Sequence, residues 1–245
     1  MPDHISRNGT LLVAPARDVR KLDLFACRTS GFTQLDSQEI ATLEPDLAGR
    51  FGRGLFLAGE AHLDPSKPLL APRDKLLGIA ARLKFGCGAV PAITNTEVDC
   101  TGITDTRAEL RGLRGEMPML RTREIALARP VRLLRPRIPV YVVPRSESFF
   151  IVGATMIECD AAGPITARSI IDLLGTACAL HPAFGEAELV EAGVGAPPAF
   201  ADNLPRVECE GKNIRINGLY RHGFLLAPAM ARQAADLILG TPAAK

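Results

Sequence analysis

The residues best suited to chemistry lie near the end of the chain, where a glycine-bearing loop joins a predicted strand to a predicted helix. The segment reads Gly218-Leu219-Tyr220-Arg221-His222-Gly223-Phe224-Leu225-Leu226-Ala227-Pro228-Ala229. The first turn of a helix has backbone N–H groups without intrahelical partners and a partial positive charge, so it can hold an anion or an electron-rich heterocycle. Gly223 would let the backbone approach such a ligand closely. A plain strand-to-helix turn accounts for the same residues more simply, so the segment alone does not establish a site.

The bulk composition is that of an ordinary globular protein. Hydrophobic residues make up 47% of the 245 residues, charged residues 23%, and the net charge is +2. This balance gives no reason to expect nucleic acid or a membrane surface as a partner. Arg129, Arg132, Arg135 and Arg137 form a basic stretch that alternates with apolar residues, which favours a solvated strand face over a nucleic-acid site.

Several signals point to a cytoplasmic protein without a metal. No apolar run approaches the roughly 20 residues that span a bilayer. The N-terminus lacks the charged-then-apolar pattern of a secretory signal. The cysteines are scattered without a CxxC pair, and the four histidines form no ligand spacing, so we expect free thiols and no metal site. The cysteines are Cys27, Cys87, Cys100, Cys159, Cys178 and Cys209.

The hydrophobic pattern predicts helices at both ends of the chain and strands between them. Asp36 should cap a helix that stops near Glu44-Pro45, and Pro164 to Leu180 has the clearest amphipathic helical spacing. Helices are also expected over Asp18–Arg28, after Pro72 towards Leu83, and from about Pro228 to Leu239 with Gly240 as the stop. Strands are expected at 10–14, 54–58, 97–102, 116–121, 131–134, 140–143, 149–154, 189–193 and 212–219. The run of strands without long helices between them predicts an antiparallel sheet, and the whole order predicts an α+β fold.

Further segments, taken in order with Gly218–Pro228, resemble one family of flavoenzymes. These segments are Gly9–Ala14, Leu43–Leu47, Ala61–Pro65, Arg114–Met117, Tyr141–Arg145, Val152–Glu158 and Asp202–Pro205. Together they resemble the D-amino-acid-oxidase-like FAD-dependent oxidoreductases, most of all the glycine oxidases of thiamine biosynthesis. In that family a Tyr-Arg-x-Gly-hydrophobic-Leu-Leu-x-Pro string faces the isoalloxazine ring.

The resemblance implies an incomplete α/β flavin-binding part with an inserted antiparallel-sheet substrate domain. Residues 9–70 and 113–200 would then belong to the substrate domain, and residues 71–112 and 201–245 to the FAD domain. The implied activity is oxidation of glycine or a similar small amine with O2, which gives an imine, then a 2-oxo acid and ammonia, and hydrogen peroxide. Hydride passes to the flavin, so no protein nucleophile is expected. The partners would be the amino acid and O2, and a homo-oligomer is compatible with the sequence.

The resemblance also assigns roles to particular residues. Arg221 would hold the substrate carboxylate, since a guanidinium offers two parallel N–H groups to two oxygens. Val90 would lie near the adenine side of FAD. The remaining flavin contacts would come mainly from backbone atoms of Leu219, Tyr220, Arg221, His222, Gly223, Phe224 and Leu225.

Two departures from the family pattern favour a competing interpretation. The family opens with a strand, a GxGxxG loop and a helix, and no such unit of about 30 residues precedes Gly9. A second carboxylate-binding arginine of the family aligns with Pro197, which has no side-chain donor. Loss of that charge-assisted hydrogen bond would weaken substrate binding by about one to two orders of magnitude. The alternative is therefore a truncated, inactive remnant that does not bind FAD.

Overall fold

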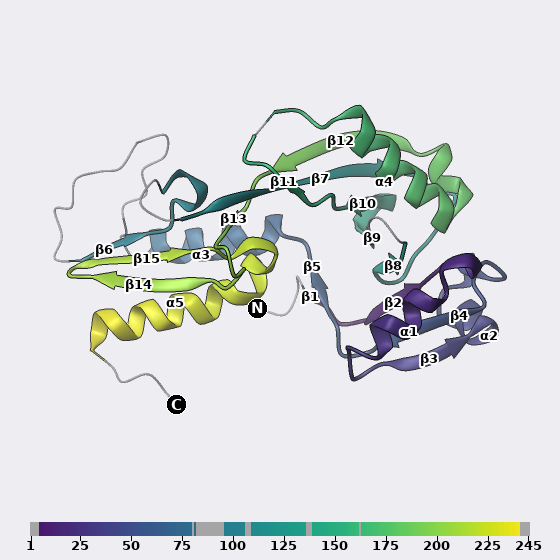
Figure 1. The fold of residues 1–245 in the computed structure, drawn as a ribbon, viewed down its shortest axis with the longest axis horizontal. Coiled ribbons are helices and arrows are strands. Elements are labelled where there is room, and N and C mark those ends of the chain that lie inside the picture. The colour runs from purple at the N-terminus through teal and green to yellow at the C-terminus, as the bar shows by residue number, and fades with distance from the viewer. Residues whose placement is uncertain are drawn as a thin grey trace. The chain divides into compact units, whose positions relative to one another are not determined.

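The chain packs as two compact units, each assembled from three segments. The computed structural model describes residues 5–79, 81, 96–105, 109–135, 139–161 and 163–240 (Figure 1). Unit 1 comprises Met1–Asp64, Gly115–Thr155 and Gly163–Val194, and unit 2 comprises Pro65–Arg114, Met156–Ala162 and Gly195–Lys245. The helices and strands mix in both units, which confirms the predicted α+β class. The domain boundaries given above stay a prediction.

Unit 1 is built on a largely antiparallel sheet with the strand order β7-β10-β9-β8-β2-β4-β3, and β12 also pairs with β7. The pairs β10/β7, β10/β9 and β8/β9 are antiparallel, which confirms the predicted run, whereas β2 and β8 are parallel. A separate short ladder joins β1 to β5. The strands are β1 (Ile5–Ser6), β2 (Thr10–Val13), β3 (Thr33–Asp36), β4 (Arg53–Leu57), β5 (His62–Leu63), β7 (Arg111–Arg121), β8 (Val131–Leu133), β9 (Val140–Pro144), β10 (Phe149–Gly153) and β12 (Glu188–Gly195).

The core of unit 1 lies on both faces of β2, whose four residues are all buried. Leu11 and Val13 point into a cluster that includes residues of α2 (Ser37–Leu43) and α4 (Ala167–Leu180). Leu12 points to the other face, where it shares a cluster with Leu22 of α1 (Arg20–Ala26). Successive side chains of a strand point to opposite faces, so this short apolar run needs cover from both sides.

Capping side chains set the starts of two helices in unit 1. Asp36 Oδ1 accepts hydrogen bonds from the amides of Gln38 and Glu39 at 2.8 and 2.9 Å, and Glu39 Oε2 accepts one from the Asp36 amide at 2.8 Å. This capping box confirms the predicted start of α2, which ends at Leu43 before Glu44. Thr166 caps α4 through the Ser169 amide, so that helix begins three residues after the predicted Pro164.

The basic stretch is not the solvated face that its alternation predicted. Arg129 is mostly buried and its Nε donates to Glu44 Oε1 at 2.6 Å, while Arg135 Nη1 donates to the Thr176 hydroxyl at 3.1 Å. Arg137 lies outside the described residues. Guanidinium groups with internal acceptors contribute to packing, and this is why an alternating pattern alone misplaced them.

Unit 2 combines a small sheet with two helices. Its sheet has the order β14-β15-β6, with β14 antiparallel and β6 parallel to β15. The helix α5 packs against β14 and β15 (Figure 1). Strands β11 and β13 pair with the first residues of β7. The elements are α3 (Ser66–Gly78), β6 (Glu97–Asp99), β11 (Ile157–Glu158), β13 (Pro198–Ala199), β14 (Arg206–Glu210), β15 (Asn213–Asn217) and α5 (Gly223–Leu239).

Two helices of unit 2 begin earlier than their prolines predicted. Helix α3 contains Pro72 and α5 contains Pro228, although the two helices were expected to start after Pro72 and at about Pro228. Proline fixes φ near the helical value and removes one donor, so a helix can continue through it at the loss of one hydrogen bond. The left-handed Gly240 ends α5 as predicted. Within the described part of the chain, no helix has both the length and the apolar character needed to cross a membrane.

Candidate functional site

The predicted turn begins at Gly218, directly after β15. Its backbone has φ +76°, in the left-handed region that favours glycine. A Cβ atom at this position would lie 2.6 Å from Cε2 of the buried Phe200 ring. The Gly218 amide donates to Asn217 Oδ1 at 2.8 Å, and Asn217 Nδ2 donates to the Gly102 carbonyl at 2.9 Å. The turn is therefore held from two sides before the chain reaches Tyr220.

The Asp202–Pro205 segment supports the same turn through Phe200. The Arg206 guanidinium lies 4.2 Å from the centre of the Phe200 ring, and Arg206 Nη2 is 2.7 Å from Asp202 Oδ2. The hydrogen bond from the Leu204 amide, followed by the charge of Arg206, lowers the pKa of Asp202 from 3.8. A carboxylate that stays ionised keeps the guanidinium over the ring. The ion pair of Arg206 with Asp202 therefore helps to hold the Phe200 ring, which contacts the turn at Gly218.

A second support reaches this segment from β7. Arg111 Nη2 donates to Asn203 Oδ1 and Nη1 to Glu158 Oε1, both at 2.7 Å. Asn203 itself has φ +60°. One guanidinium therefore links the 202–205 segment to both β7 and β11.

The chain then enters a 3₁₀ turn, Tyr220–His222, that runs into α5. No side chain caps the start of α5, and a Cβ atom built on Gly223 would meet nothing within 4 Å. Arg221 and His222 are exposed, and the exposed fractions of Phe224 and Leu225 are 48% and 75%. The start of α5 therefore combines an uncapped first turn, the exposed cation of Arg221 and the exposed apolar side chains of Phe224 and Leu225.

The predicted contact residues fall into two groups. Seven of them, Leu219 to Leu225, are continuous and surround this helix start. Val90 lies outside the described residues. Pro197, where the family would place an arginine, is half-buried and its carbonyl accepts from the Leu113 amide at 3.1 Å. Sequence reasoning missed the supporting residues Phe200, Asn217 and Arg111, because no local spacing marks a contact between distant segments.

The open start of α5 fits one part of FAD, the electron-rich edge of the isoalloxazine ring. Such an edge needs N–H donors that no side chain caps, close backbone approach and apolar neighbours, and the start of α5 around Gly223 has an uncapped first turn, open space at Gly223 and two exposed apolar side chains. Within the described residues, no group of three or more histidines, cysteines or acidic residues lies close enough to hold a metal ion.

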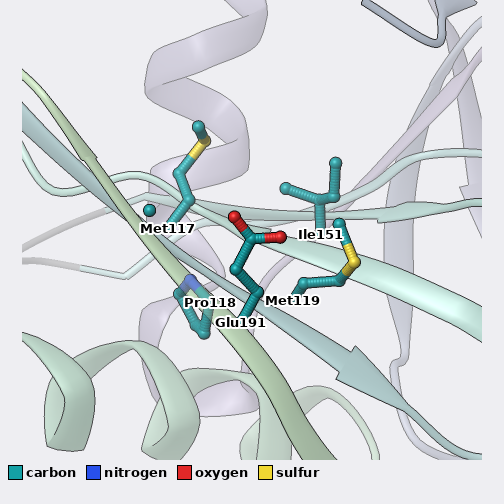
Figure 2. Close-up of a pocket in the computed structure, with 6 residues that line it drawn as sticks. Met117, Pro118, Met119, Ile151 and Glu191 are labelled. Carbon is teal, nitrogen blue, oxygen red and sulfur yellow. The ribbon is translucent and has the colours of Figure 1, made fainter. Parts of the chain in front are cut away.

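Unit 1 contains a separate small cavity on the face of its sheet. Its volume is about 120 Å³, and Figure 2 shows the side chains around it, drawn from β7, β10 and β12. The lining residues are Met117, Pro118, Met119, Ile151, Glu191 and Gly193. The cavity is mainly apolar, with the Glu191 carboxylate as its charged group.

Comparison with known proteins identifies the class to which this fold and site belong. The family model for FAD-dependent oxidoreductases matches residues 2–237, which is nearly the whole chain. The chain therefore belongs to the FAD-dependent oxidoreductase family.

Individual relatives show which members of the family this chain resembles. A protein of Rhizobium etli named thiamine biosynthesis oxidoreductase ThiO is 54% identical over 242 residues, which cover 98% of this chain and 74% of that protein. A glycine oxidase of Bacillus licheniformis is 33% identical over 105 residues, covering 42% of this chain and 28% of the relative. The crystal structure of glycine oxidase from Geobacillus kaustophilus superposes with a TM-score of 0.81 at 20% identity, covering 98% of this chain and 73% of that one. At 20% identity, this structural match shows that the fold is shared.

Substitution of Gly218 by alanine tests the support beneath the site. The positive φ costs a non-glycine residue about 1–2 kcal/mol, and displacement of the Phe200 ring adds about 1–3 kcal/mol. Gly211→Ala is the matched control, because Gly211 has φ +63° but open space around its Cβ position. In urea unfolding, Gly218→Ala should lose more free energy of unfolding than Gly211→Ala. Equal losses would show that Phe200 does not fix this turn.

Proposed function

We propose that this protein oxidises glycine or a similar small amine to an imine, with FAD as cofactor, O2 as electron acceptor and hydrogen peroxide as the second product. The observation that carries the proposal is the uncapped, open start of α5 with Arg221 beside it, in a chain of this family. The Rhizobium etli relative is named for thiamine biosynthesis, which supports a place for this reaction in that pathway. The imine would then serve to form the thiazole of thiamine.

The chemistry of the proposal requires a two-electron acceptor, and bound FAD supplies it. The amine loses two electrons and two protons to become the imine, which water hydrolyses to a 2-oxo acid and ammonia. O2 takes up the two electrons and two protons and becomes hydrogen peroxide. The amide groups at Gly223 would stabilise negative charge on the ring edge, because a helix start favours an anion.

Arg221 would orient the substrate in this reaction. Its guanidinium is exposed, and no hydrogen bond or ion pair engages it among the described residues. Two parallel N–H groups match the two oxygens of a carboxylate, so an α-amino acid would be held by its carboxylate with its amine directed elsewhere. Phe224 and Leu225 would exclude water beside the ring edge, which strengthens the charge interactions there.

The competing interpretation is an inactive remnant that does not bind FAD. The 54% identity to the Rhizobium etli relative over 242 residues does not favour this interpretation. The discriminating experiment is an oxygen-electrode assay with glycine, sarcosine and D-alanine, coupled to detection of peroxide. We expect amine-dependent oxygen uptake with an equimolar amount of peroxide. Flavin-loaded protein that consumes no oxygen with any of the three amines would contradict the proposed reaction.

A further inference from the structure

Both tyrosines of the chain donate a hydrogen bond to a methionine sulfur. Within unit 1, Tyr141 Oη lies 3.5 Å from Met117 Sδ, and within unit 2, Tyr220 Oη lies 2.6 Å from Met156 Sδ. A thioether is a weak acceptor, so a tyrosine hydroxyl gains little stability from it. Two such pairs in a chain with two tyrosines and five methionines suggest that the arrangement has a chemical consequence.

Both sulfur-bearing side chains are accessible. The exposed fractions of Met117 and Met156 are 40% and 58%. Met117 also borders the cavity of about 120 Å³, together with Met119 two residues along the same strand (Figure 2). A cavity of this size holds several water-sized molecules, and hydrogen peroxide is only slightly larger than water. Oxidation of methionine depends on such access.

We propose that Met117 and Met156 are sites of oxidation to methionine sulfoxide by hydrogen peroxide, each assisted by its tyrosine. A sulfur lone pair attacks one peroxide oxygen, the S–O bond forms and the O–O bond breaks. The departing hydroxide takes a proton and leaves as water, while the oxygen now bound to sulfur loses its own proton to solvent, which gives the sulfoxide. The sulfur loses two electrons and the peroxide gains them. The tyrosine hydroxyl has one proton, so it would turn from the sulfur to the departing oxygen and donate its hydrogen bond there, which lowers the barrier as a general acid does.

The packing around Met117 determines where the added oxygen can lie. A Cβ atom on Gly153 would be 2.8 Å from Met117 Cγ and 3.0 Å from Tyr141 Oη, so that side is closed. The new oxygen would therefore lie on the open side of the sulfur, which faces the cavity and solvent. Sulfoxide formation would turn an apolar wall of this cavity into a polar one, a change that sulfoxide reductases can reverse. Only the source of the peroxide rests on the proposed function.

The test adds hydrogen peroxide to the resting full-length chain without any amine and follows each methionine by peptide mass mapping. In Tyr141→Phe, oxidation of Met117 should be slowed at least about threefold, while the rates at Met119 and Met156 stay unchanged. Tyr220→Phe should show the reciprocal pattern, with Met156 slowed and Met117 unchanged. Met119 is the internal control because it lines the same cavity.

Three outcomes would overturn the proposal. Met117 could oxidise at the same rate or faster in Tyr141→Phe, all methionines could change together, or neither Met117 nor Met156 could oxidise in the parent chain. If the oxidation rates of all methionines changed together, the cause would be a general opening of the fold and not the loss of the tyrosine hydroxyl. Because the peroxide is added, a chain without oxidase activity still gives a decisive result, and failure of the proposed function is measured separately by oxygen uptake.

Discussion

Replacement of Arg221 by alanine is expected to raise KM for the amino-acid substrate about 10- to 100-fold, with a smaller change in kcat. The loss corresponds to a charge-assisted hydrogen bond worth about 1.5–3 kcal/mol. Arg221 is exposed and sits at the 3₁₀ turn before α5, so its removal should leave the free energy of unfolding nearly unchanged. Arg221→Lys should recover part of the affinity, because an ammonium keeps the charge but not the two parallel donors.

A control variant and a binding measurement test the role of Arg221 without relying on turnover alone. Arg232→Ala removes another exposed arginine from α5 itself and should leave KM unchanged. Titration with acetate should perturb the flavin absorbance of the parent chain, and the apparent Kd for acetate should rise in Arg221→Ala by a similar factor. Identical affinities in Arg221→Ala and Arg232→Ala would remove Arg221 from the substrate site.

Substitution of Arg129 by methionine is expected to lower the free energy of unfolding by about 3–5 kcal/mol near pH 7.5, because it leaves a buried carboxylate without its ion-pair partner. Glu44 is fully buried, and its Oε1 lies 2.6 Å from Arg129 Nε. Arg129 also donates to the carbonyl groups of Asn8 and Leu43. Urea unfolding measures the loss.

Two comparisons test the cause of that loss. Arg53→Met breaks the exposed pair with Asp23, 2.9 Å apart, and should cost no more than about 1 kcal/mol. The double variant Glu44→Leu/Arg129→Met should regain much of the stability, since neither charge is then buried. A double variant as unstable as Arg129→Met would show that packing of the arginine stem matters more than the charge.

The Arg129→Met variant should also depend on pH in a defined direction. Burial raises the pKa of Glu44 above 4.5, while hydrogen bonds from the Ala128 amide and Arg129 oppose this. Without the guanidinium the folded-state pKa rises further, so the folded variant holds a proton that the unfolded chain has released. Its stability should therefore increase as the pH falls from that raised pKa towards 4.5. A loss that is the same at pH 5 and pH 7.5 would contradict this account.

Local sequence patterns predicted several helices and strands, because the interactions that start or bury these elements are between residues close in sequence. Asp36 and Glu39 sit three residues apart and form the capping box that their spacing predicts. The apolar run at 10–13 became a strand buried on both faces. The start of α5 was misplaced because Pro228 was taken as its first turn, whereas the helix begins at Gly223 and continues through the proline.

Contacts between distant segments could not be predicted in this way. Glu44 and Arg129 are 85 residues apart, and no spacing links them. The contact of Phe200 with Gly218 depends on how two segments pack, so the sequence showed a glycine at position 218 but not why a glycine is needed there. The candidate site therefore shows both cases: its seven consecutive residues follow from the local pattern and the family resemblance, and its supports follow only from the structure.

The most direct test of the central claim is the cofactor content of the purified full chain. An absorbance spectrum should show flavin bands, and denaturation should release FAD in an amount equimolar with protein, either as isolated or after incubation with FAD. Gly223→Val should reduce that content, because a side chain would occupy the open space beside the first amides of α5. A folded chain that holds no flavin after such incubation would contradict the assignment of the α5 start as the flavin-facing site.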